Sequence, residues 1–244
     1  MGRAHEVRAE SMAKTSLAKS KIYSRFGKEI YMLAKTGGAD PTGNLSLKKA
    51  IEKAKANQVP ADVIKRNLDK AKGAGGEDYF PVRYEGFGPG GSTVIIECMT
   101  DNVNRTFGEV RACFTKTGGK MGIAGSVIHQ YRYVSMLALE GLSEDETLEA
   151  LMNANCEVSD ISTEDGIVTV IGEASALDSI RDAILAIKPD VELLVDKVTY
   201  LANEYIDLDE EALGKLTRFI GLTDELDDVQ DVFHNVNIPV TDEE

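Results

Sequence analysis

The amino-acid sequence predicts an α+β protein, with an N-terminal three-helix domain followed by two α/β domains, the third of which is inserted into the second. Three observations support this fold class. Basic residues concentrate in the first third of the chain, where apolar residues recur with a helical period. From about residue 79 the pattern changes to short strands and glycine-rich turns. Residues 132–200 follow the order β-α-β-β-α-β, which is typical of a ferredoxin-like domain.

The charge of the chain changes sign between its two parts. Residues 1–80 contain sixteen Lys and Arg against nine Asp and Glu, a net charge of +7. Because the whole chain carries −14, residues 81–244 carry −21. A basic segment of this size predicts contact with a polyanion, since Lys and Arg that bind phosphates release condensed counterions. The acidic remainder repels the same polyanion, so we expect one-sided contact.

A helix is expected over residues 12–35, because apolar side chains recur there every three or four positions. This stripe consists of Ile22, Phe26, Ile30 and Leu33. Five cations share a sector of about 80°, whose centre lies about 150° from the stripe. They are Lys14, Lys21, Arg25, Lys28 and Lys35. Glu29 is the only acid in this segment, so ion pairing within the helix does not account for the cations.

Two shorter helices complete an expected basic helical domain over residues 1–76. They are predicted at residues 45–56 and 60–72, with a proline suited to the first turn of the latter. The first of the two adds further candidate phosphate ligands, Lys48 and Lys49. Three glycines within residues 73–76 predict a hinge after this domain.

The second domain is expected to combine residues 77–131 with residues 201–244. Its expected elements are strands at 79–86 and 92–100, a helix at 106–117, a glycine-rich loop at 118–125, a strand at 126–131, an acidic helical segment at 207–234 and a short strand at 236–240. The last two pieces are too small to fold alone, so we expect them to pack onto residues 77–131. Residues 132–200 then form the inserted third domain.

No pattern of catalytic residues is found. The match of residues 86–91 to Gly-x-Gly-x-x-Gly joins two expected strands, whereas a dinucleotide-binding loop joins a strand to a helix. His5, His129 and His234 are isolated, and the cysteines lack metal spacing. We therefore expect no enzyme, no cofactor and no metal. An enzyme that uses the 118–125 loop as a lid, and a scaffold whose acidic C-terminal half binds a basic partner, are the rival hypotheses.

The loop at 118–125 is a further candidate contact. Its four glycines predict mobility and close backbone approach to a partner, and it presents Lys120 and Met121. The alternative is that the loop is only a flexible connection and contacts no partner.

Composition favours a cytoplasmic protein. The apolar runs are too short to cross a bilayer, and no signal core precedes residue 12. Three widely spaced cysteines fit a reducing compartment. The expected partner is a nucleic acid, with no membrane, and the chain is expected to be a monomer.

Several sequence blocks resemble the YebC/PmpR family. They are Arg83-Tyr84-Glu85-Gly86-Phe87-Gly88-Pro89-Gly90-Gly91, Glu97-Cys98-Met99-Thr100-Asp101-Asn102-Val103-Asn104-Arg105-Thr106, Gly118-Gly119-Lys120-Met121-Gly122 and the segment from Ala50 to Ala56. The likeness covers the whole chain except its start. Many members open with basic His-Ser-Lys-Trp and Lys-His-Arg-Lys segments, whereas residues 1–10 here contain two acids and no Trp.

The resemblance implies three domains and a regulator of gene expression. Family members are generally named DNA-binding transcriptional regulators, and the mitochondrial relatives are translational activators. Members are also linked to ribosomes and to relief of stalling at proline-rich stretches. Since phosphate contacts position a protein without specifying sequence, the residues favour a structured RNA or weak DNA binding over tight operator recognition. With the resemblance, DNA or ribosomal RNA and the ribosome are the expected partners.

Overall fold

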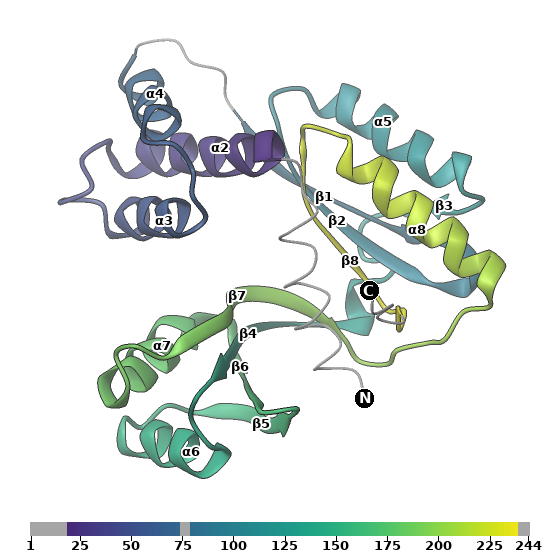
Figure 1. Cartoon of the computed structure of the whole chain (residues 1–244). Coiled ribbons are helices and arrows are strands. Elements are labelled where there is room, and N and C mark those ends of the chain that lie inside the picture. The colour runs from purple at the N-terminus through teal and green to yellow at the C-terminus, as the bar shows by residue number, and fades with distance from the viewer. Residues whose placement is uncertain (1–18, 74–78, 239–244) are drawn as a thin grey trace.

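The protein is represented by a computed structural model that describes residues 19–73 and 79–238, and it has three parts (Figure 1). The helical domain consists of α2 (Lys19–Gly37), α3 (Leu45–Ala56) and α4 (Ala61–Lys72). Its core joins the stripe of α2 to buried residues of the other two helices, including Leu47, Ile51 and Ile64. Asn44 caps α3: its side chain accepts a hydrogen bond from the Leu47 amide at 3.1 Å.

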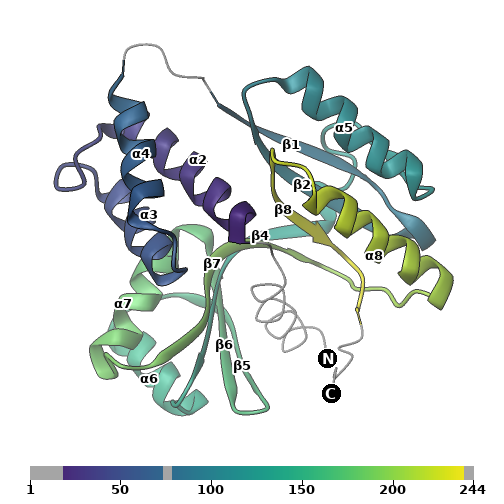
Figure 2. The same cartoon turned by 45° about the horizontal axis from the view of Figure 1, so that its top comes forward.

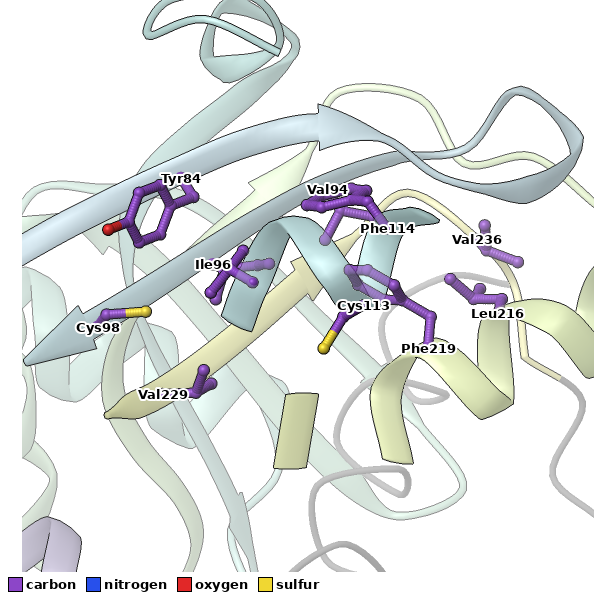
Figure 3. Packing of buried hydrophobic residues seen from close by; sticks show 11 residues of the cluster. Tyr84, Val94, Ile96, Cys98, Cys113, Phe114, Leu216, Phe219, Val229 and Val236 are labelled. Atoms are coloured by element: carbon purple, nitrogen blue, oxygen red, sulfur yellow. The ribbon is translucent and has the colours of Figure 1, made fainter. Parts of the chain in front are cut away.

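The second domain packs two helices on one face of a four-stranded antiparallel sheet (Figure 1). Its elements are β1 (Phe80–Phe87), β2 (Thr93–Thr100), α5 (Val103–Lys116), β3 (Lys120–Met121), α8 (Glu210–Asp224) and β8 (Val229–His234), and the strand order is β3-β1-β2-β8. Figure 3 shows the core between sheet and helices, where the rings of Phe114 and Phe219 lie 4.7 Å apart. Because β8 pairs with β2, the C-terminal part of the chain completes this domain.

The third domain is inserted between β3 and α8. Its elements are β4 (Tyr131–Glu140), α6 (Glu144–Asn153), β5 (Val158–Glu164), β6 (Ile167–Glu173), α7 (Leu177–Ile187) and β7 (Glu192–Ala202). The strand order β5-β6-β4-β7 with antiparallel pairing throughout is that of the predicted ferredoxin-like unit. Leu137, Leu139 and Val168 face the two helices, where they pack against Leu151 and Ile184. The predicted α+β class, with one domain inserted into another, is confirmed.

Two of the expected strands are wrong. Residues 126–131 do not form a strand, because Ile128–Gln130 is a 3-10 turn that leads directly into β4. The third strand of this sheet is β3, which lies inside the expected loop and pairs with Gly86 and Phe87 of β1. The final strand lies at 229–234 rather than 236–240, since α8 ends at Asp224 and the apolar residues that follow pair with β2. Residues 74–78, which hold most of the expected hinge, lie outside the described residues.

Candidate nucleic-acid interface

The basic sector of α2 faces the acidic second domain. Lys21 pairs with Asp224 at 3.2 Å, and Arg25 pairs with Asp231 at 2.5 Å. Lys28 reaches Asp228 at 2.9 Å. Three cations that the sequence assigns to phosphate contact therefore have carboxylate partners from the C-terminal part of the chain.

Asp228 is the centre of this contact. Its side chain is only 4% exposed, and it accepts hydrogen bonds from Lys28, from Arg105 at 2.6 Å and from the hydroxyls of Thr100 and Thr106 at 2.9 and 2.7 Å. Burial raises the pKa of this carboxyl, but the bonds from Arg105, Lys28 and the two threonines outweigh burial and hold its pKa well below the usual range. The carboxylate stays charged and links α2, β2 and α5.

The remaining predicted cations have different surroundings. Lys49 of α3 pairs with Asp178 of α7, and bonds from Lys49 and Arg181 lower the pKa of that carboxyl. Lys35 is exposed and lies over the Tyr31 ring, with its ammonium 5.6 Å from the ring centroid. Lys48 is exposed. Lys14 lies outside the described residues.

Four ion pairs therefore join the described helical domain to the other two domains. The docking cations are Lys21, Arg25, Lys28 and Lys49, and the docking acids are Asp224, Asp231, Asp228 and Asp178. In each pair the cation belongs to the helical domain and the acid to the acidic remainder. Figure 2 shows the resulting arrangement, with α2 directed at the second domain and α3 beside the third.

Among the described residues, the helical domain shares no apolar core with the other two domains. The core of the helical domain contains residues 22–71 alone, and the other clusters contain none of its residues. An edge-to-face contact between Tyr31 and Tyr79, with ring centroids 5.7 Å apart, is the aromatic contact at this boundary. Charge pairing is thus the main interaction that holds the described helical domain to the other two domains.

A second group of cations lies on the surface of α3 and α4. This α3–α4 basic surface is defined as the exposed cations Lys48, Lys53, Lys55, Lys65 and Arg66. Lys70 and Lys72 of α4 are also exposed, but Lys70 lies over the rings of Tyr31 and Tyr79, and Lys72 pairs with Asp69. The acids interspersed on these helices are Glu52, Asp62 and Asp69. Of these cations, the sequence predicted only Lys48 as a phosphate ligand. The helical period shows which residues share a face but not what that face contacts, so it could not single out the other four.

The glycine-rich loop is held in place by Glu85. Its buried carboxylate accepts hydrogen bonds from the backbone amides of Gly125, Val127 and Ile128 at 2.8, 2.8 and 2.9 Å. Burial raises the pKa of Glu85, but these three amides outweigh it and lower the pKa. Sequence reasoning missed this residue, although it stands within the block Arg83-Tyr84-Glu85-Gly86.

Two glycines of this loop, Gly119 and Gly122, allow close packing. A Cβ at Gly122 would lie 2.3 Å from Ser126 Oγ, and one at Gly119 would lie 2.7 Å from a backbone oxygen. Lys120 is exposed, as predicted for a contact residue. Met121 instead packs against the core of the second domain. The exposed apolar side chain of the loop is Ile123, at 82%.

Within the described ranges, no three His, Cys, Asp or Glu side chains are grouped in a way that could hold a metal ion. None of the helices in those ranges combines the length and the apolar character needed to span a bilayer.

Comparison with known proteins gives the family. A model described as the TACO1/YebC N-terminal domain matches residues 3–74, and one for the second and third TACO1/YebC domains matches residues 79–236. The chain belongs to the TACO1/YebC family. This agrees with the resemblance found in the sequence blocks, and the two models together describe an N-terminal, a second and a third domain.

The similar proteins cover nearly the whole chain. Probable transcriptional regulatory proteins of Vibrio vulnificus strain YJ016 and Alcanivorax borkumensis are 49% and 48% identical over 98% of this chain and all of their own length. A crystal structure of a conserved hypothetical protein of Aquifex aeolicus aligns with a TM-score of 0.79 and 30% identity, over 95% of this chain and 96% of that one. At family level these names describe a regulatory protein.

Proposed function

We propose that this protein is a nucleic-acid-binding regulator of gene expression whose helical domain contacts the phosphate backbone. The observation that carries the proposal is the α3–α4 basic surface, five exposed cations on two adjacent helices of an otherwise acidic protein. Such side chains bind phosphates through counterion release and charge-assisted hydrogen bonds. The acidic second and third domains orient the polyanion toward the helical domain.

DNA is the first target to test, because the similar proteins are named transcriptional regulatory proteins. The alternative is a ribosome-associated translation factor that binds ribosomal RNA and relieves stalling at proline-rich stretches. The same cations suit A-form RNA, which proteins contact largely through its backbone and 2′-hydroxyls. The side chains of Lys120 and Ile123, exposed on a loop fixed by Glu85, offer a second contact on either target.

The test is the affinity of the full chain for a DNA duplex, a ribosomal RNA fragment and intact ribosomes at two salt concentrations. The variant carries Lys48→Glu, Lys55→Glu and Arg66→Glu. If each of these residues contacts a phosphate, its loss should flatten the log–log salt slope by about 0.9, or about 2.7 for all three. The target that the wild type binds most tightly at the higher salt concentration is the preferred class of ligand.

A matched control has the same change in net charge outside the helical domain. It carries Arg111→Glu, Arg132→Glu and Arg218→Glu, all at exposed positions. The control should retain most of the wild-type affinity, while the α3–α4 variant loses it with an unchanged circular dichroism spectrum. Equal losses in the two variants would mean that net charge alone matters, and the assignment to the helical domain would be wrong.

A further inference from the structure

The docking acids stand where phosphates would be expected. The basic sector of α2 has the composition of a phosphate-binding helix face, with Lys21, Arg25 and Lys28 on one side. In this structure each of these cations binds an aspartate from the acidic remainder. Carboxylate and phosphate oxygens accept the same charge-assisted hydrogen bonds from Lys and Arg.

We propose that the docking acids are an internal competitor for nucleic acid, and that a bound phosphate backbone displaces them and releases the helical domain. This inference rests on the proposed function, because it concerns how access to the same domain is regulated. The α3–α4 basic surface makes the first contact. The docking cations become available as the helical domain leaves the other two.

The paired side chains are exposed enough for phosphates to replace the docking acids. The side chains of Lys49 and Asp178 are 41% and 51% exposed, and those of Arg25 and Asp231 are 39% and 29% exposed. Pairs of this kind contribute little to stability and are screened by salt. Domain interfaces without a large apolar contact commonly permit relative motion, and no apolar cluster joins the helical domain to the rest among the described residues.

The most buried pair does not block release. Lys28 and Asp228 are 11% and 4% exposed. When the domains separate, Lys28 becomes hydrated, so no unpaired charge remains buried on the helical side. Asp228 retains Arg105 and the hydroxyls of Thr100 and Thr106 as donors. The carboxylate therefore remains bonded within its own domain after α2 leaves.

The test uses the full-length chain with Asp224→Asn and Asp231→Asn, which removes the negative charges that pair with Lys21 and Arg25 and leaves Asp228 intact. Affinity for a DNA duplex or ribosomal RNA fragment should rise by about fivefold at low salt, because a phosphate no longer has to displace an aspartate from Lys21 or Arg25. The log–log salt slope should become steeper in the variant, because rising salt also weakens the competing ion pairs of the wild type and the variant lacks two of them. A control with Asp145→Asn and Asp190→Asn has the same charge change at exposed sites in the third domain.

A second measurement reports the conformation without nucleic acid. The radius of gyration from solution X-ray scattering should increase with salt in the wild type and should already be larger at low salt in the Asp224→Asn/Asp231→Asn variant. Wild-type protein that binds no nucleic acid at low salt would refute the proposed function. Wild-type binding with identical affinity, slope and radius for the variant and its control would refute internal competition alone.

Discussion

Replacing Asp228 by Asn should destabilise the protein far more than its size suggests. The carboxylate is 4% exposed and accepts bonds from two charged donors, Lys28 and Arg105. Asn has no negative charge and presents one oxygen and a donor NH₂ group, so one of these two bonds becomes a donor–donor contact and the other loses its charged acceptor. Each charge-assisted bond contributes about 1.5 kcal/mol, and we expect the free energy of unfolding to fall by about 3 kcal/mol at pH 7.

Urea denaturation followed by circular dichroism measures this loss. With a slope of about 2 kcal/mol per molar, the midpoint should move down by about 1.5 M. The matched control is Asp227→Asn, the same chemical change one residue earlier at an exposed position, and its midpoint should stay near the wild-type value.

The lowered pKa of Asp228 determines how its contribution to the free energy of unfolding depends on pH. The folded-state pKa of Asp228 lies below its unfolded value of about 4. Its contribution to stability is therefore fully present above pH 4 and is lost as the pH falls through the folded pKa. The difference between wild type and Asp228→Asn should be constant from pH 7 to pH 5 and should shrink below pH 4. A variant as stable as the Asp227→Asn control at pH 7 would refute the role of Asp228 as the centre of the domain contact.

Two further outcomes are expected from the buried groups. Glu85→Gln should accelerate hydrogen exchange of the backbone amides at residues 125, 127 and 128 by about tenfold or more, because the glutamine side chain cannot accept all three hydrogen bonds. Unchanged exchange would show that the loop does not depend on this carboxylate. Burial raises the pKa of Cys98 to about 12, so iodoacetamide at pH 8 should spare Cys98 and modify the half-exposed Cys156 in the native protein. Mass spectrometry that finds Cys98 modified first would contradict this.

The sequence predicted the helical domain, the inserted domain and most element positions because each depends on local periodicity. The stripe of α2, the strands around the glycine-rich turn and the β-α-β-β-α-β order all arise from spacing within one segment. The short strand β3 was missed because its pairing with β1 is set by close packing at Gly86 and Gly119. Periodicity over two residues cannot indicate such a strand.

The partners of the basic sector could not be predicted from periodicity. Helical spacing places Lys21, Arg25 and Lys28 on one face, but it does not show what that face meets. Asp224 and Asp231 are about 200 residues away in sequence and approach α2 only after β8 joins β2. The dense run of acids at 224–231 is a visible signal, but sequence reasoning assigns it to an acidic helical segment or to the binding of a separate basic partner, and not to the chain's own basic domain.

The central claim is that nucleic acid binds the helical domain, and lysine footprinting tests it most directly. The native protein is labelled by reductive methylation with and without a DNA duplex or ribosomal RNA fragment, and the modified residues are identified by mass spectrometry. Protection should appear at Lys48, Lys53, Lys55 and Lys65, which are exposed in this structure. Equal labelling of these four lysines with and without nucleic acid, under conditions where binding is measured independently, would contradict the claim.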